Sequence, residues 1–218
     1  MVRLLCISDI HGHADALAAV FAAAERRGYN RILVAGDLCF PGPSPLETWR
    51  RLNGAHAICV QGSGDRALAT LDLERVTPRN EHERVRLQRL GEVRRELGDL
   101  ILRQVARLPQ TFRMPLDGGR QLVMVHGSPA DPLECITHDM TDNEILSLLG
   151  DDPADVVVCG GSHVPFDRMV SRVRIVNLGS VGEAPRGQGT GHADVTFIET
   201  ASDGILVDQF AVPLGRAA

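Results

Sequence analysis

VRLLCISDIHGH (residues 2–13) contains the pattern that decides the fold class of this 218-residue chain. An apolar run of strand length (2–8) ends directly before an acid, and an Ala-rich helical run follows over 14–28, ending in arginines and Gly28. Further strands are expected over 31–36 and 55–62. Between them, 44–52 should form a helix with Ser44 as its cap and Pro45 in its first turn. The alternation of strand and helix predicts a parallel sheet with right-handed crossovers.

The remaining sequence predicts a second group of strands. Residues 65–108 are polar, charged and helical in pattern. Residues 112–127 predict a hairpin, and 154–160 another buried strand. The run 141–150 predicts a helix with a capping box made by Thr141 and Glu144. The last runs alternate as antiparallel strands do, with a turn over 202–204. No repeat or linker interrupts the chain, so we expect an α/β protein with two sheets in a single domain, 1–218.

Composition narrows the functional classes. The formal net charge is -5, the pI is near 5.9, and acids interleave with the mid-chain arginines, so nucleic acid is an unlikely main partner. Five cysteines without a C-x-x-C pair are typical of a reduced, cytosolic protein. The apolar run at the N-terminus is too short for a signal peptide or a membrane span. We therefore expect a cytoplasmic protein with no membrane contact.

Acids and histidines follow the predicted strands one after another. In open α/β sheets, function gathers at the carboxyl ends of the strands. Each residue alone has a structural explanation, such as a helix cap, a turn or a buried histidine, but these do not explain the shared location. Residues two apart on a strand point the same way, so Asp9 and His11 could share one ion. Mixed Asp/His ligation suits Mn, Fe, Zn or Ni. The residues concerned are Asp9, His11, Asp37, Ser63, Asp65, His126 and His163.

The ordered run SDIHGH (8–13), AGDL (35–38), GSGDR (62–66), VHGS (125–128), GGSHVPF (160–166) and NLGSVG (177–182) resembles the calcineurin-like metallophosphoesterase family. Its small bacterial phosphodiesterase-type members are the most similar. The resemblance covers nearly the whole chain. It implies a four-layer α-β-β-α sandwich of two mixed sheets, with a helical insertion over about 66–110. It also implies two metal ions about 3.5–4 Å apart.

The resemblance implies a ligand set for each ion. Asp9, His11, Asp37 and His163 would hold the first ion. Asp37 would bridge to the second, which His126 would also hold, together with the asparagine of a G-N-x-D motif and the first histidine of a G-H-x-H motif.

This sequence departs from that pattern at the second ion. Ser63 stands at the asparagine position and Gly161 at the first histidine of G-H-x-H. Gly64 stands where the family often carries a histidine that protonates the leaving group. Affinity follows ligand number, charge and basicity. We therefore expect one tightly bound divalent metal and a second that is weak or absent, with Ser63 a poor ligand.

Two residues are candidates for catalytic roles, Asp65 and His13. Asp65 could instead cap the following helix or support a ligand, and His13 could instead be an exposed loop histidine. His192 and Cys39 are possible replacement ligands or proton donors, with an exposed loop and a buried thiol as the alternatives. The backbone N–H groups of residues 160–162 could help to cradle an anion.

Three functions are compatible with these features. The first is an active metal-dependent phosphoesterase, preferring phosphodiesters, that uses a metal-activated water on a small phosphate-ester substrate. The second is a catalytically weak one-metal relative that serves as a binding or regulatory protein. The third, an unrelated nucleotide binder, is disfavoured because neither G-x-G-x-x-G after the first strand nor G-x-x-x-x-G-K-[ST] occurs. Substrate, native metal and oligomeric state are not encoded in any motif that we find.

Overall fold

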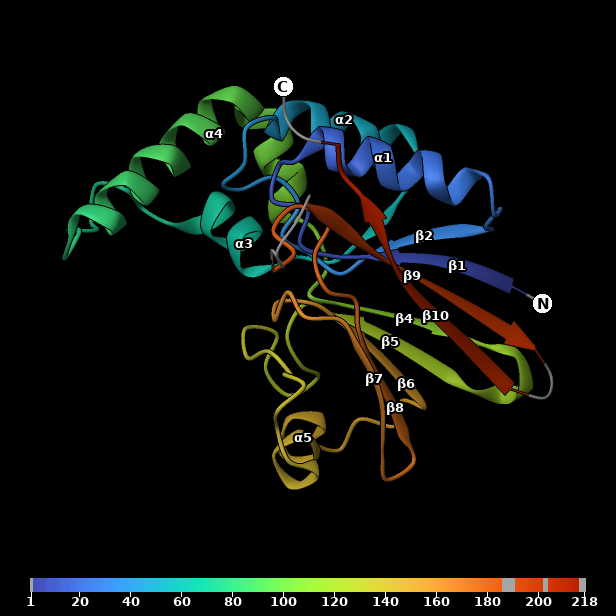
Figure 1. Ribbon diagram of the computed structural model, residues 1–218. Helices are drawn as coiled ribbons and strands as arrows, with labels where there is room; N and C mark the ends of the chain where they lie inside the picture. Colours follow the sequence, from blue (N-terminus) through green and yellow to red (C-terminus); the bar gives the residue numbers. More distant parts are fainter. Residues whose placement is uncertain (1, 186–190, 202–203, 216–218) are drawn as a thin grey trace.

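The computed structural model describes residues 2–185, 191–201 and 204–215 (Figure 1). Its strands are β1 (Val2–Ile7), β2 (Arg31–Val34), β3 (Ile58–Cys59), β4 (Thr111–Pro115), β5 (Gln121–Val125), β6 (Val156–Cys159), β7 (Phe166–Val170), β8 (Val173–Asn177), β9 (His192–Ala201) and β10 (Gly204–Pro213). Its α-helices are α1 (Ala14–Glu25), α2 (Pro45–Gly54), α3 (Ser63–Thr70), α4 (Glu81–Ala106) and α5 (Asp142–Leu149).

The strands form two mixed sheets. One has the order β10-β9-β1-β2-β3, in which β1, β2 and β3 are parallel and β9 runs antiparallel to β1. The other has the order β4-β5-β6-β8-β7, in which β5, β6 and β8 are parallel between two antiparallel edge strands. The predicted hairpin over 112–127 and the antiparallel final strands are confirmed.

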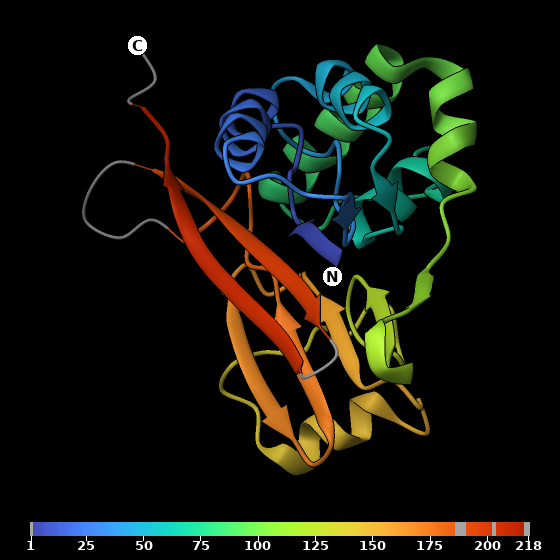
Figure 2. The ribbon, with the colours of Figure 1, turned by 90° about the vertical axis from the view of Figure 1, so that its right-hand side faces the viewer.

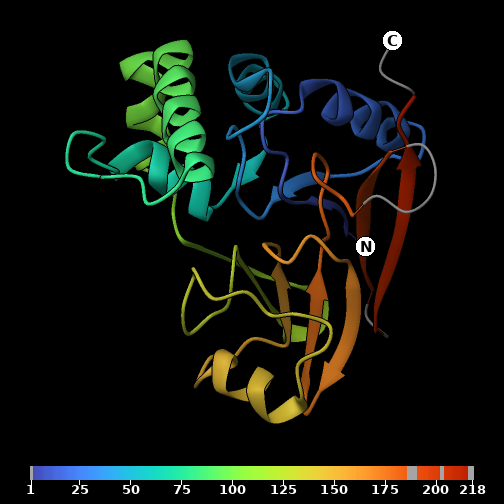
Figure 3. The ribbon, with the colours of Figure 1, turned by 60° about the vertical axis from the view of Figure 1, so that its left-hand side comes forward.

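The two sheets lie face to face between two layers of helices. Helices α1, α2 and α4 lie on the far side of the first sheet, and α5 on the far side of the second (Figures 1 and 3). Alternate residues of one strand therefore enter different cores: Leu5 and Ile7 of β1 pack with the helices, whereas Leu4 and Cys6 pack between the sheets. Burial on both faces explains the continuous apolar runs. The four-layer sandwich expected from the resemblance is confirmed.

The last two strands, β9 and β10, connect the two sheets. The hairpin of β9 and β10 extends from the edge of the first sheet alongside the second (Figure 2). Gln209 on β10 donates a hydrogen bond to the carbonyl of Asn177 at 2.8 Å, and Arg174 donates to the carbonyl of Ile205 at 2.5 Å. Both donors bridge the two sheets, and the bond from Gln209 lies at the carboxyl end of β8.

Several local expectations need correction. The third strand spans two residues rather than 55–62. Ser44 occupies the position before α2, but its side chain makes no capping hydrogen bond. The insertion over 66–110 begins earlier, since α3 starts at Ser63, and α4 is interrupted at Gly98 by a positive φ of 72°. The capping box of Thr141 and Glu144 is confirmed.

Two further points concern the extent of the structure. The turn expected over 202–204 falls largely on residues 202–203, outside the described ranges. Within those ranges, no helix combines the length and the apolar composition that crossing a membrane requires.

Candidate metal centre

The candidate side chains come from loops at the carboxyl ends of parallel strands in both sheets. Asp9 follows β1 and Asp37 follows β2, and from the other sheet His126 follows β5 and His163 follows β6. The shared location expected from the sequence therefore exists, and the sheet-on-sheet packing brings the two halves of the site together.

Four of these residues have an unusual backbone conformation. Asp9, His11, Asp37 and His163 all have φ between 51° and 59°, a region that L-residues with side chains rarely adopt. Such conformations cluster at functional sites, where the surrounding structure holds them. The expectation that strand alternation aligns Asp9 with His11 was wrong, because β1 ends at Ile7 and both residues lie in the loop beyond it. They converge because of these left-handed turns.

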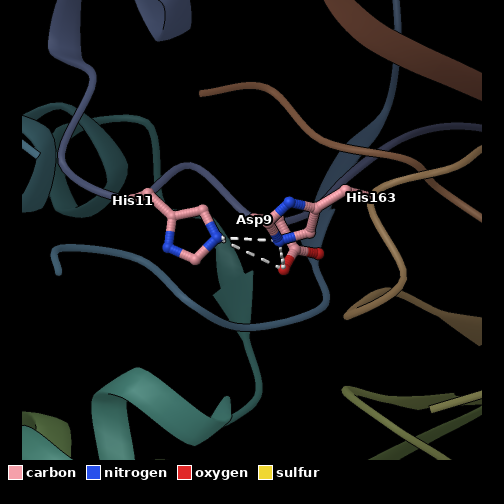
Figure 4. A group of neighbouring side chains, drawn as sticks. All are labelled: Asp9, His11 and His163. Atoms are coloured by element: carbon pink, nitrogen blue, oxygen red, sulfur yellow. Dashed lines mark hydrogen bonds and ion pairs between the residues drawn. The ribbon is translucent and has the colours of Figure 1, made fainter. Parts of the chain in front are cut away.

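Asp9, His11 and His163 form the first cluster (Figure 4). The Nε2 atoms of the two histidines lie 3.0 Å apart. Oδ1 of Asp9 lies 3.1 Å from Nε2 of His163 and 3.6 Å from Nε2 of His11. Asp9 is fully buried, and within the described residues its Oδ1 atom has no hydrogen-bond partner. Three donor atoms thus face one small space.

The charges in this cluster favour a cation. Burial alone would raise the pKa of Asp9, yet the imidazoles of His11 and His163 hold it well below its ordinary value. Burial alone would lower the pKa of His11, but the neighbouring carboxylates of Asp9 and Asp37 raise it to about 9. Without an ion, the carboxylates are therefore balanced by imidazolium. A divalent cation would take over that charge as protons leave.

Asp9, Asp37 and His126 form the second cluster, in which all ligand atoms lie within 4.8 Å of one another. Nε2 of His126 lies 3.7 Å from Oδ2 of Asp37. Burial opposes protonation of His126, but the charges of Asp37 and Asp9 raise its pKa above the ordinary value. The carboxylate of Asp9 belongs to both clusters and so connects them.

The protein backbone orients the two buried imidazoles. Nδ1 of His11 lies 2.7 Å from the carbonyl oxygen of Phe40, and Nδ1 of His126 lies 2.8 Å from that of Ala35. A carbonyl only accepts, so Nδ1 carries the proton in each ring and Nε2 is turned toward the cluster. Metal-binding histidines are typically oriented in this way.

Backbone and hydroxyl donors hold the carboxylates. The N–H of Gly64 donates to Oδ1 of Asp37 at 2.7 Å, and the hydroxyl of Ser63 donates to Oδ2 at 3.2 Å. On the other side, the N–H of Gly161 donates to Oδ2 of Asp9 at 2.9 Å. The hydroxyl of Ser180, in the GSVG stretch, donates to the carbonyl of Asp9 at 2.8 Å. These contacts fix the carboxylates before any ion binds.

The space beside Gly161, where the resemblance implied a histidine, is filled by a residue that the sequence did not single out. A Cβ at Gly161 would lie 2.3 Å from Sγ of Cys135 and 3.4 Å from Nε2 of His126. The thiol of Cys135 therefore takes the space that a side chain at 161 would use. Burial and the nearby carboxylates of Asp9 and Asp37 raise the pKa of Cys135 to about 11, so the metal-free thiol is neutral.

A second overlooked residue is Glu183, just after the GSVG stretch. Its Oε2 lies 3.8 Å from Nε2 of His11. The sequence offered one signal for Glu183, its position directly after the GSVG stretch that resembles the family. Cys135, in contrast, lies in a loop with no recognisable motif.

The other sequence candidates lie around the clusters. Asp65 is fully buried, and its two oxygens accept the backbone N–H groups of Leu38 and Gly62, each at 3.0 Å. Burial and the charge of Asp37 raise its pKa to about 6. It is the third residue of α3 rather than a cap before the helix. Its carboxylate thus ties the loop after β2 to the loop after β3.

The three remaining candidates differ in their surroundings. His13 is half-buried before α1, and a Cβ at Gly182 would lie 2.6 Å from its ring. His192 lies 3.5 Å from Asp194 and belongs to neither cluster. Cys39 is fully buried in the core under the helices. Neither His192 nor Cys39 is placed as a ligand in this structure.

The expectation that residues 160–162 offer free N–H groups to an anion was wrong. Gly160 donates to the carbonyl of His126, Gly161 donates to Asp9, and Ser162 donates to the carbonyl of Gly160. All three donors are already used to shape the loop that carries His163.

These residues fit a divalent metal. An unpartnered buried carboxylate oxygen and Nε2 atoms turned toward one space are what Asp/His ligation requires. The possible ligands are Asp9, His11, Asp37, His126 and His163.

Comparison with known proteins agrees with this geometry. Residues 2–201 match the sequence model of the calcineurin-like phosphoesterase superfamily domain. The uncharacterized protein MJ0912 of Methanocaldococcus jannaschii is 25% identical over 162 residues, which cover 73% of this chain and 62% of that protein. The chain thus spans less than two thirds of that relative's length.

Solved structures that are similar over nearly the whole chain include the following two. A metallophosphoesterase from Sphaerobacter thermophilus has a TM-score of 0.71 and 26% identity, covering 95% of this chain and 87% of that one. The hypothetical protein PH1004 from Pyrococcus horikoshii OT3 has a TM-score of 0.82 at 19% identity, covering 99% and 90%. At that identity, the second likeness shows the fold alone.

Proposed function

The chain belongs to the calcineurin-like phosphoesterase superfamily, and from this premise we propose that it hydrolyses small phosphate esters, preferably phosphodiesters, in a divalent-metal-dependent reaction. The observation that carries the proposal is the convergence of two Asp/His clusters that share the carboxylate of Asp9. A structural role alone would not require four of these residues to hold positive φ.

The roles of the chain's own residues follow from their contacts. The clusters would place Asp9, His11 and His163 on the first ion and Asp9, Asp37 and His126 on the second. The family resemblance would add Asp37 to the first set and make it the bridging ligand. A divalent ion bound there would supply a Lewis acid that polarises a phosphoryl oxygen and makes water more acidic. The carbonyls of Phe40 and Ala35 keep the imidazoles oriented, and the N–H groups of Gly64 and Gly161 keep the carboxylates in place.

We infer that the second ion binds more weakly than the first. Ser63 is exposed and its hydroxyl already donates to Asp37, Gly161 offers no side chain, and the thiol of Cys135 occupies the adjacent space. A hydroxyl is a weaker ligand than an amide or an imidazole for the metals that suit this donor set, Mn, Fe, Zn or Ni.

Two further roles belong to this proposal. Asp65 supports the site by binding the loops that carry Asp37 and Ser63, rather than by contacting the substrate. His13 is the candidate proton donor, and the test is His13→Gln. A proton donor predicts a lower rate for esters with poor leaving groups and little change for p-nitrophenyl esters. An equal loss for both would contradict that role.

The function is tested by hydrolysis of bis(p-nitrophenyl) phosphate and p-nitrophenyl phosphate in excess Mn²⁺. Asp37→Asn is the control, because it removes a carboxylate of the second cluster that the family resemblance also places on the first ion. Turnover that is lost in Asp37→Asn supports a phosphoesterase, and a higher kcat/KM for the diester supports the diester preference. Equal turnover in both proteins would mean that the activity comes from elsewhere.

The incomplete second ligand set also favours an alternative, a one-metal relative that acts as a binding or regulatory protein. It predicts about one bound metal per chain by elemental analysis and no turnover above the Asp37→Asn control. Two bound metals, or metal-dependent turnover, would exclude it.

A further inference from the structure

A pocket of about 280 Å³ lies beside the second cluster, between α3 and the start of α4. Four segments line it, with Phe40 from the loop after β2, Ala67 from α3, Val76 from the α3–α4 connection, and Leu87 and Leu90 from α4. It is small compared with most ligand sites, which span roughly 300–1,000 Å³. Its size suits one ring system rather than a polymer.

The pocket adjoins the metal centre through two of its lining residues. Ser63 and Gly64 line it, and both donate hydrogen bonds to Asp37. A Cβ at Gly64 would lie 3.3 Å from Oδ1 of Asp37 and 3.6 Å from the ring of Phe40. The glycine therefore separates the carboxylate from the aromatic wall by little more than one atom. A group attached to a phosphate at the cluster could enter the pocket directly.

The charged residues at the pocket are not equivalent. Arg79 is neutralised by Glu83, which accepts hydrogen bonds from its backbone and its side chain. Arg86 is exposed and lies over the ring of Phe40 at 4.8 Å, and within the described part of the chain no ion pair is found for it. A guanidinium already packed on one ring is suited to contact a second planar, electron-rich group.

We propose that this pocket binds a planar aromatic group of the ester, such as an aryl ring or a nucleobase, while the metal centre binds its phosphate. The inference rests on the proposed function for the phosphate, but it makes a separate claim about the organic part. Apolar walls from Phe40, Ala67 and Leu87 remove the ring from water, and Arg86 adds a cation.

The test uses two ligands that cannot be hydrolysed, phenylphosphonate and methylphosphonate, with binding measured by calorimetry on the Mn²⁺-loaded protein. Two buried methylene equivalents already contribute roughly tenfold in affinity. We therefore expect phenylphosphonate to bind at least about tenfold more tightly than methylphosphonate.

Two variants address the pocket and one serves as a matched control. Ala67→Phe fills the pocket, and Leu87→Gln removes apolar surface at almost constant size without adding charge. Val85→Gln makes a similar change two residues away on α4, where Val85 is 52% exposed and does not line the pocket. The preference for phenylphosphonate should disappear in Ala67→Phe, fall in Leu87→Gln and persist in Val85→Gln. Methylphosphonate affinity should stay within about twofold.

The outcomes separate this inference from the proposed function. Equal wild-type affinity for both phosphonates would overturn the pocket assignment and leave the metal-centre proposal standing. If Ala67→Phe and Leu87→Gln both still bind phenylphosphonate more tightly than methylphosphonate, the ring binds elsewhere. That result would also overturn the pocket assignment. If neither phosphonate binds, the phosphate site itself is wrong and both proposals fall.

Discussion

Gly161→His introduces the histidine that the family pattern carries, and the structure predicts that it destabilises the protein. Gly161 has a φ of +73°, and a Cβ there would lie 2.3 Å from Sγ of Cys135. A non-bonded heavy atom essentially never lies within 3.0 Å of a Cβ, so the side chain of Cys135 must move. The substitution therefore combines backbone strain with a steric clash.

The two costs can be estimated separately. A non-glycine residue in the left-handed region costs roughly 1–2 kcal/mol, and overpacking a close-packed site costs typically about 1–3 kcal/mol. The unfolding free energy of Gly161→His should therefore fall by about 2–5 kcal/mol. For a chain of this length, each kcal/mol lowers Tm by roughly 2–4 °C.

Urea denaturation in EDTA measures this change without a contribution from metal binding. Gly119→His is the matched control, because Gly119 has a φ of +73° and a Cβ added there would meet nothing within 4 Å. It should lose only the strain cost. The double variant Gly161→His/Cys135→Ala should recover the clash cost, with Cys135→Ala alone as its reference.

Equal losses in Gly161→His and Gly119→His would refute the claim that Cys135 fills the space at 161. So would a double variant that is no more stable than Gly161→His. If Cys135 does fill that space, introducing a histidine at 161 requires replacing Cys135 as well.

Three further predictions concern the surrounding structure. Asp65→Asn removes one of the two carboxylate oxygens that accept backbone N–H groups. The unfolding free energy, measured by urea denaturation, should therefore fall by about 1–3 kcal/mol. Because the pKa of Asp65 is raised to about 6, the stability it contributes is fully present below pH 3.8, its ordinary pKa, and is lost as the pH rises through 6. In metal-free Asp65→Asn, this fall in stability with rising pH should be absent. A pH profile of stability that is the same as in the metal-free wild type would contradict the prediction. Gly62→Ala places a Cβ 2.2 Å from Oδ1 of Asp37 and should weaken Mn²⁺ binding by about 10–100-fold in calorimetry; unchanged affinity would mean that Asp37 can move freely. Thr141→Ala removes the α5 cap and should cost about 1 kcal/mol while metal affinity stays constant, and a loss of metal would show that α5 is coupled to the site.

Prediction from the sequence succeeded where the signal is local. The apolar runs of β1, β2, β5 and β6 are long enough to identify strands, and the polar residues after them mark the carboxyl ends. The capping box before α5 was recognisable for the same reason. The third strand failed because only Ile58 and Cys59 pair with β2, although the apolar run is longer.

Prediction failed where the contact is long-range or the backbone leaves the regular conformations. Period-two alternation could not describe Asp9 and His11, which converge through positive φ beyond the strand. Free N–H groups at 160–162 looked available because their acceptors, such as Asp9, lie far away in the sequence.

The sequence by itself determined the parallel strands, the order of acids and histidines at their ends, and the presence of serine at position 63 and glycine at position 161. These depend on periodicity and residue identity, which are local properties. Only the tertiary structure decided that Asp9 is shared by two clusters, that Cys135 occupies the space at 161, and that a pocket opens beside Gly64. Each of these arises where segments distant in the chain pack together, and the distance between two such side chains is set by the packing of the sheets and helices rather than by any pattern within one segment.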